Sequence, residues 1–171
     1  MASPTPKAAD GKPDLSGLWA NYCQAGDRMV LCLPEIAVPI PGLIVFLSER
    51  NASYRQVYTD GRALPEELNP AWNGYSTGRW EGDTLVVETT GFVDGQWLDR
   101  SGSPLTSSAR MTERFRRPNY GTLEIELTVD DPKAYTKPWS IQLKQSILLD
   151  SDLLDYICLE NEKDAAHLVG K

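Results

Sequence analysis

The sequence predicts an all-β fold: a single antiparallel up-and-down β-barrel of about eight or nine strands with long loops. Apolar and polar residues alternate with period two in several runs, tight-turn signals separate these runs, and few segments show a helical pattern. Closure into a barrel is favoured because it removes the exposed edges that such strands would otherwise leave. A β-sandwich is the competing architecture.

The chain is expected to form one domain, since 171 residues suit a single hydrophobic core. Residues 1–14 are rich in Pro, Ala and Lys and predict a disordered N-terminal arm, which leaves 15–171 for the barrel. The stretch 21–42 carries Pro34, Pro39 and Pro41 and predicts a long irregular segment, because a sheet interior does not accept so many prolines.

The first predicted strands follow this segment. Residues 43–48 are a continuous apolar run, typical of a strand covered on both faces, and 53–59 alternate up to the turn signal Asp60-Gly61. Residues 61–74 predict a loop with one helical turn. The segment 79–92 predicts a β-hairpin, because the tight-turn residues 81–83 separate two strand-like runs.

The second half begins with an irregular stretch and then contains the most regular strands. The strands predicted there are 110–117, 121–129 and 140–149, followed by a weaker one over 153–160 and a short C-terminal helix over 162–169. Residues 110–117 place Met111, Glu113 and Phe115 on one face.

Charge argues against several partners. The net charge of −7 repels phosphate backbones and anionic lipid, and no run approaches the ~20 apolar residues that span a bilayer. We therefore expect a small-molecule ligand rather than nucleic acid or membrane insertion, and a homo-oligomer stays open. The basic residues of 110–117 are Arg110, Arg114, Arg116 and Arg117, and their mixture with an acid predicts a solvated or salt-bridged face rather than an anion site.

No metal or cofactor is expected. The three cysteines, Cys23, Cys32 and Cys158, lack the paired short spacing of a zinc site, and the chain has one His. One disulfide with one free thiol, or three reduced thiols, are both compatible with this pattern. No phosphate loop, zinc helix, nucleophile elbow or dinucleotide fingerprint is present.

The tripeptide Gly17-Leu18-Trp19, placed after an arm and before an all-β chain, resembles the Gly-x-Trp signature of lipocalins and related calycin barrels. In that superfamily the Trp closes one end of the barrel against an Arg of a late strand. The resemblance implies Arg114 or Arg116 as this partner, through a cation–π contact.

A wider resemblance covers residues 11–171. The strings DGKPDLSG, YTDGR, GYSTGRWEGDTLVVETTGF, TERFRR and CLENEKDAAHLVGK are similar to a family of exported bacterial proteins described as hypothetical. The resemblance implies a β-barrel-like domain in a periplasmic or secreted setting, with a cytoplasmic one as the alternative, and it carries no activity. No signal peptide is visible at the N-terminus. Such sequences often have His where this chain has Leu105.

Glu113 is the first candidate for chemistry. Its strand face is otherwise apolar, so a barrel interior would disfavour its charged form and suit it to proton transfer. A structural ion pair is the alternative interpretation, as is a one-residue slip in register that turns the side chain outward. On the catalytic interpretation, Glu113→Gln abolishes turnover and changes the melting temperature by only a few degrees.

Tyr58, Asp60 and Arg62 are the second candidate group. At a barrel mouth they could orient the polar end of a substrate, with Arg62 gripping a carboxylate. A turn in which Asp60 caps its own backbone is the alternative.

Aromatic side chains in irregular segments form the third group, since loops at a barrel mouth could use them to wall a pocket. The residues expected to bind ligand are Arg62, Trp72, Tyr75, Trp97, Arg114 and Trp139. Loop packing that plugs the end of the barrel is the alternative.

The function expected from these patterns is a cofactor-independent barrel enzyme. It would act on a small apolar or aromatic molecule by proton transfer, as an isomerase, lyase or cyclase, with Glu113, Tyr58 and Asp60 as catalytic residues. The alternative is a non-catalytic, lipocalin-like binder of a small hydrophobic ligand. A carbohydrate-binding or interaction module is a third, weaker interpretation.

Overall fold

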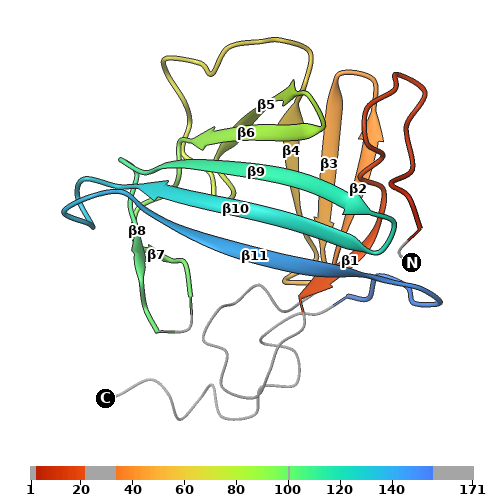
Figure 1. Cartoon of the computed structure of the whole chain (residues 1–171). Coiled ribbons are helices and arrows are strands. Elements are labelled where there is room, and N and C mark those ends of the chain that lie inside the picture. Colours follow the sequence, from red (N-terminus) through yellow and green to blue (C-terminus); the bar gives the residue numbers. More distant parts are fainter. Residues whose placement is uncertain (1–2, 22–33, 100, 156–171) are drawn as a thin grey trace.

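The computed structural model describes residues 3–21, 34–99 and 101–155, and these form a closed β-barrel (Figure 1). Around the barrel the strands follow the order β1-β11-β10-β9-β6-β5-β4-β3-β2. Their bounds are β1 Gly17–Asn21, β2 Glu35–Ile40, β3 Leu43–Ser48, β4 Ser53–Tyr58, β5 Tyr75–Glu81, β6 Thr84–Thr90, β9 Arg110–Asn119, β10 Thr122–Asp130 and β11 Trp139–Leu148. A separate two-stranded sheet pairs β7 Gln96–Trp97 with β8 Pro104–Leu105. The prediction of a single all-β barrel with long loops is confirmed.

One pair of neighbouring strands departs from the predicted antiparallel pattern. β4 and β5 pair in parallel, through Val57 with Ser76 and Tyr58 with Thr77. Strands that alternate in direction around a closed ring must be even in number, so a nine-stranded ring needs a parallel pair. Parallel neighbours also require a crossover connection. Residues 59–74 supply it, and Figure 1 shows them as the long yellow loop beside β4 and β5.

The hairpin predicted over 79–92 is confirmed. β5 and β6 are antiparallel from Tyr75–Thr90 to Glu81–Thr84, so Gly82 and Asp83 form a two-residue turn. Gly82 has φ of 62°, a left-handed conformation that glycine adopts without strain.

The prediction of an irregular segment over 21–42 is wrong for its last part, because β2 lies there. β2 pairs with β3 along its whole length, but β1 reaches only as far as Ala37. Pro39 therefore lies where β2 is an edge on the β1 side, and a missing N–H there costs no ladder hydrogen bond. The predicted helix over 162–169 lies outside the described residues, and 153–155 are not in a strand.

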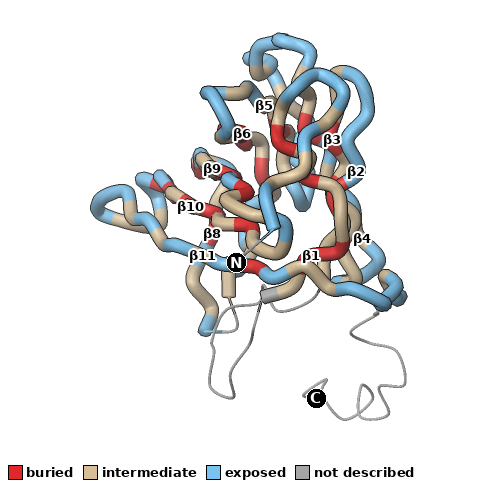
Figure 2. Tube along the Cα trace, turned by 45° about the vertical axis from the view of Figure 1, so that its right-hand side comes forward, coloured by how far each residue is buried: buried red, intermediate tan, exposed pale blue. Residues whose placement is uncertain are grey.

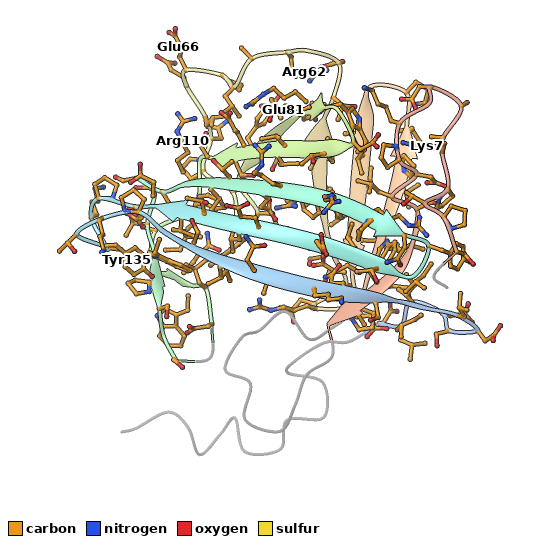
Figure 3. All side chains as sticks on the ribbon, viewed as in Figure 1. Lys7, Arg62, Glu66, Glu81, Arg110 and Tyr135 are labelled. Atoms are coloured by element: carbon orange, nitrogen blue, oxygen red, sulfur yellow. The ribbon has the colours of Figure 1, made fainter. Side chains whose placement is uncertain are left out.

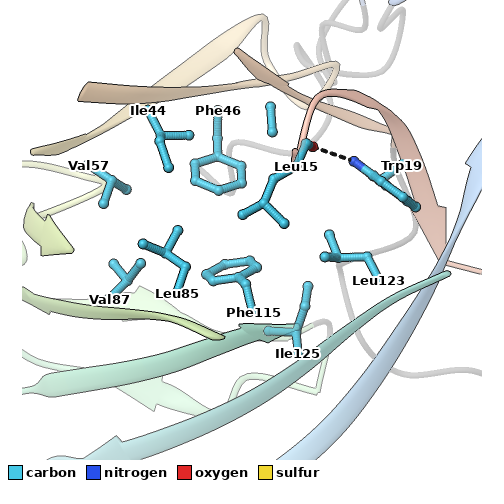
Figure 4. Packing of buried hydrophobic residues seen from close by; sticks show 11 residues of the cluster. Leu15, Trp19, Ile44, Phe46, Val57, Leu85, Val87, Phe115, Leu123 and Ile125 are labelled. Carbon is cyan, nitrogen blue, oxygen red and sulfur yellow. Dashed lines mark hydrogen bonds between the residues drawn. The ribbon is translucent and has the colours of Figure 1, made fainter. Parts of the chain in front are cut away.

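Figure 2 shows buried residues alternating with less buried ones along the strands, and the buried apolar side chains form two clusters. The first contains Leu15, Trp19, Ile44, Phe46, Val57, Leu85, Val87, Phe115, Leu123 and Ile125 (Figure 4). The second contains Phe92, Leu105, Ala109, Leu127 and Val129. Period-two alternation on β9 and β10 delivers Phe115 and Ile125 to the interior, as predicted.

The outer face of β5, β6 and β9 carries a ladder of ion pairs. Arg79 contacts Glu88 at 2.7 Å, Arg110 contacts Glu88 at 3.4 Å, and Arg114 contacts Glu81 at 2.9 Å. This confirms the salt-bridged face predicted for Arg110 and Arg114, and Arg116 pairs with Glu124 on the same outer surface.

Trp19 closes one end of the barrel against Arg117, not against Arg114 or Arg116 as the resemblance implied. The Arg117 guanidinium lies 4.7 Å from the Trp19 ring centroid, and the Trp19 indole donates to the Leu15 carbonyl at 2.9 Å. The physical reason for the correction is parity: the alternation that turns Glu113 and Phe115 inward also turns residue 117 inward and residues 114 and 116 outward.

Arg117 also satisfies backbone carbonyl groups that this end of the barrel leaves without a ladder partner. It donates to the carbonyl oxygens of Asp14, Ser16 and Tyr120, the last at 2.6 Å. Part of the N-terminal arm lies here too, since the Thr5 hydroxyl donates to the Arg117 carbonyl at 2.8 Å. Arg117 therefore ties the first segment of the chain to the β9–β10 turn.

We expect Arg117→Met to lower the free energy of unfolding by about 2–3 kcal/mol, because it removes the cation–π contact and the donors to three carbonyl groups while keeping an apolar stem. Arg116→Met, on the exposed outer face, should cost no more than about 1 kcal/mol. Urea denaturation followed by tryptophan fluorescence measures both. Equal losses in the two variants would show that the Trp19–Arg117 contact does not secure this end.

Candidate functional site

The barrel holds a cavity of about 580 Å³ between the Trp19 end and the opposite end. Its apolar wall comes mainly from β9, β10 and β11, whose alternate side chains face inward. The residues of this wall are Phe46, Met111, Phe115, Ile125, Leu127, Ile141 and Leu143. Branched and aromatic side chains on pleated strands form a surface that suits an apolar molecule.

Three connections surround the mouth of the cavity. Trp72 lies near the end of the 59–74 crossover, Trp97 lies in β7, and Tyr54 lies at the start of β4, just after the β3–β4 turn. These side chains remain well exposed, at 70%, 70% and 63%. Exposed aromatic groups of this size at the rim of a cavity are unusual for packing alone and are typical of ligand entry.

Hydrogen bonds to a carboxylate hold the loop between β7 and β8. The Asp99 carboxylate accepts hydrogen bonds from the backbone N–H groups of Ser101 and Ser103 and from the Ser103 hydroxyl at 2.7 Å. These bonds hold the pKa of Asp99 below its ordinary value. Asp131, which is buried, accepts from the backbone and hydroxyl of Thr106. The rim is thus fixed by carboxylates acting as turn acceptors.

Inside the cavity, Arg55 of β4 meets Glu113 of β9 in a two-pronged ion pair. Nη1 of Arg55 lies 2.6 Å from Oε2 of Glu113, and Nη2 lies 3.3 Å from Oε1. The two side chains are only 20% and 12% exposed. Burial lowers the pKa of Arg55, but the charge and hydrogen bonds of Glu113 outweigh it and hold that pKa above its ordinary value.

Glu113 is therefore buried among apolar neighbours, as the strand pattern predicted, and the ion-pair interpretation describes its surroundings. Both of its oxygens are engaged by one guanidinium group, so a substrate would have to compete with Arg55 for them. Removing Glu113 alone would leave the Arg55 charge buried and unpaired, at a cost of roughly 3 kcal/mol. This geometry therefore predicts that Glu113→Gln destabilises the protein, in contrast to the small change in melting temperature expected if Glu113 is catalytic.

Glu35, the first residue of β2, is the second carboxylate that lines the cavity. It is half-buried beside the Arg55–Glu113 pair. Burial is the largest effect on Glu35 and raises its pKa; the charge of Arg55 lowers it and that of Glu113 raises it further. The two carboxylates in the cavity thus have different environments: Glu113 is paired with a guanidinium group, and Glu35 is partly desolvated.

Gln145 of β11 supplies a neutral polar group in the same cavity. It is 4% exposed and lines the cavity wall. Within the described parts of the chain its side-chain amide makes no hydrogen bond. An amide carries two donors and an acceptor, so one that faces the cavity is a group to which a ligand or water can hydrogen-bond.

The structure brings only part of the sequence-predicted site together. Glu113, Trp72, Trp97 and Trp139 line the cavity. The Trp139 ring packs edge-on against Tyr135 with centroids 5.6 Å apart, and its Nε1 atom is buried without a partner among the described residues.

Tyr58, Asp60 and Arg62 do not reach the cavity. Arg62 pairs with Asp60 at 2.6 Å, and its guanidinium lies 3.9 Å from the centroid of Tyr58, which stacks on Tyr75 at 5.2 Å. Asp60 also accepts from the Arg62 backbone N–H, as in the turn interpretation. Figure 3 shows Arg62 on the long connection, far from Tyr135 at the cavity rim. Tyr75 belongs to this outer cluster.

Arg114, a predicted ligand-binding residue, faces outward and pairs with Glu81. The sequence interpretation missed Glu35 and Arg55. Arg55 could have been found, because alternation in 53–58 places it between Ser53 and Val57 on the inward face. Glu35 carried no such signal, since its segment was predicted to be irregular.

The comparisons with known proteins add no family. No protein-family model matches the chain, and neither a curated protein nor a solved structure matches it. Among the described residues, no three His, Cys, Asp or Glu side chains gather in a way that could hold a metal ion. In the same part of the chain, no helix has the length and apolar character needed to cross a membrane.

Replacing Glu35 should change stability in a pH-dependent way. Because burial raises the pKa of Glu35 above its ordinary value of 4.5, the folded state holds this proton more tightly than the unfolded state. The unfolding free energy contributed by Glu35 therefore falls as pH rises through the window that begins near 4.5. Glu35→Gln should be more stable than the native protein at neutral pH, and the difference should vanish toward about pH 3.5.

Urea denaturation at several pH values measures this difference. Glu66→Gln, which changes an exposed carboxylate on the 59–74 connection, serves as the control and should show no such trend. A Glu35→Gln variant that is less stable than the native protein at neutral pH would contradict the burial argument.

Proposed function

We propose that the protein binds a small, mostly apolar molecule inside the barrel, in the manner of a lipocalin-like carrier. The observation that carries the proposal is the cavity of about 580 Å³ inside a closed barrel, with an apolar wall on β9, β10 and β11 and polar groups elsewhere on its lining. Ligand sites of this kind typically span ~300–1,000 Å³ and use a small number of polar side chains to orient the ligand.

The architecture of the mouth supports the same proposal. Exposed Trp72 and Trp97 flank the mouth of the cavity, where a ligand with an apolar body would first make contact. The resemblance to exported bacterial proteins supports a periplasmic or secreted setting for this binding. The negative net charge of −7 favours neutral or cationic small molecules over nucleic acid as partners.

Binding of N-phenyl-1-naphthylamine, an uncharged apolar fluorophore, tests the proposal. We expect saturable enhancement of its fluorescence by the native protein. Met111→Trp, which fills the cavity from β9, should weaken this binding by at least about tenfold, or ~1.4 kcal/mol. Thr112→Trp introduces the same side chain at the next residue on the outward face and should leave the affinity unchanged.

Circular dichroism confirms that both variants fold before affinities are compared. Equal affinity in the native protein and in folded Met111→Trp would place the probe outside the cavity and reject the proposal. Loss of binding in Thr112→Trp alone would point to the outer surface instead.

Proton transfer on the bound molecule is the second candidate function, and the two unlike carboxylates favour it. A carboxylate whose pKa is raised by burial is a candidate catalytic acid or base. Here Glu35, with its burial-raised pKa, suits the acid or base role better than Glu113, whose oxygens Arg55 occupies. The predicted roles of Tyr58 and Asp60 gain no support from their position outside the cavity.

Deuterium incorporation tests this second function. The compound that copurifies with the native protein is extracted, returned to fresh protein in D2O and analysed by mass spectrometry. A proton-transfer enzyme should introduce deuterium at a carbon-bound position, and Glu35→Gln should lower the rate by about a hundredfold or more. A recovered compound without carbon-bound deuterium would leave binding as the function.

A further inference from the structure

The charged groups of the cavity do not balance. Its lining includes three carboxylates, Glu35, Asp99 and Glu113, and two guanidinium groups, Arg50 and Arg55. Asp99 and Arg50 lie at the mouth, and Asp99 is occupied by the turn hydrogen bonds described above. When all five groups are ionised, the lining of the cavity therefore has a net charge of −1.

The excess charge lies at Glu35. Arg55 is the cation nearest to both interior acids, and its two Nη atoms are directed at Glu113. Arg55 attracts Glu35 only through space, with no hydrogen bond between them among the described residues. A carboxylate that has lost part of its water and is not paired is costly unless a cation or a hydrogen-bond donor reaches it.

Gln145 gives an independent sign that a polar group enters the same space. The residue is 4% exposed and lines the cavity, and its amide makes no hydrogen bond within the described part of the chain. Strand β1 lies between β2, which carries Glu35, and β11, which carries Gln145. Around the ring, Gln145 on β11 therefore lies two strands from Glu35 on β2 and two strands from Glu113 on β9, and all three residues line the cavity.

We infer that the molecule bound in the cavity is a primary amine, whose ammonium group is held by Glu35 and Gln145 and whose apolar body lies along the β9–β11 wall. An ammonium group offers three donors, which match a carboxylate and an amide oxygen. Its charge neutralises the cavity. The inference rests on the proposed function, because it names the class of ligand that the same cavity takes.

The same arrangement disfavours an anion. A carboxylate ligand beside Glu35 would meet no free cation in the interior, since the guanidinium group of Arg55 is already engaged by Glu113 and Arg50 lies at the mouth. Like charges placed together in a partly desolvated site repel strongly. A neutral alcohol would satisfy the amide but leave the excess charge in place.

Three ligands with one aromatic body test the inference by isothermal titration calorimetry with the native protein at neutral pH. They are 1-naphthylmethylamine, 1-naphthalenemethanol and 1-naphthoate. We expect the amine to bind at least about tenfold more tightly than the alcohol, because hydrogen bonds to charged groups contribute more than neutral ones. The carboxylate should bind most weakly.

Glu35→Gln should remove the preference for the amine over the alcohol while keeping affinity for the alcohol. Glu126→Gln removes the same charge from β10 at a position between the inward-facing Ile125 and Leu127, and it should keep the preference. If Glu35→Gln still binds the amine more tightly than the alcohol, the preference comes from the overall charge of the protein, and the inference is overturned.

The outcomes distinguish failure of the amine assignment from failure of the proposed binding function. If the alcohol or N-phenyl-1-naphthylamine binds and the amine binds no more tightly than the alcohol, the amine assignment falls and the cavity remains a binding site for neutral apolar molecules. If none of these compounds binds, the proposed function fails together with the inference.

Discussion

Closure of a nine-stranded ring is the constraint on which the rest of this structure depends. An odd ring cannot alternate throughout, so β4 and β5 run in parallel and residues 59–74 must return the chain to the other end of the barrel. This crossover carries Trp72 to the cavity mouth. It also leaves the first residues of β4 beyond the reach of β5, where the Asn73 side chain donates to the Tyr54 carbonyl at 2.8 Å. Ring closure thus places part of the site.

The interior combines apolar packing with a few charges, and each charge is handled differently. Arg117 lies against Trp19 and donates to three carbonyl groups, so its charge helps to close the barrel. Arg55 and Glu113 neutralise one another across the cavity. Glu35 has no such partner among the described side chains, and burial raises its pKa. This difference separates groups that maintain the fold from one that is available to a ligand.

Local patterns predicted the regular strands well and the charged residues less well. Alternation on β9 placed Glu113 inside correctly, and the same alternation would have selected Arg117 over Arg114 and Arg116 as the partner of Trp19. β2 was missed because Pro39 argues against a strand unless one knows that β1 stops at Ala37. Asp60 and Arg62 were predicted to lie at the mouth of the barrel, but they form an ion pair away from the cavity. The local sequence does not indicate which end of β4 the cavity faces.

The sequence by itself determined the fold class, the turns and which side of most strands is apolar, since these depend on neighbours within a few residues. Tertiary structure alone decided the parallel pair, the position of the cavity and the partners of each interior charge. Arg55 and Glu113 are separated by 58 residues, and Glu35 joins them only because the barrel closes. Contacts of this kind depend on strand order and register around the ring, which no short stretch of sequence encodes.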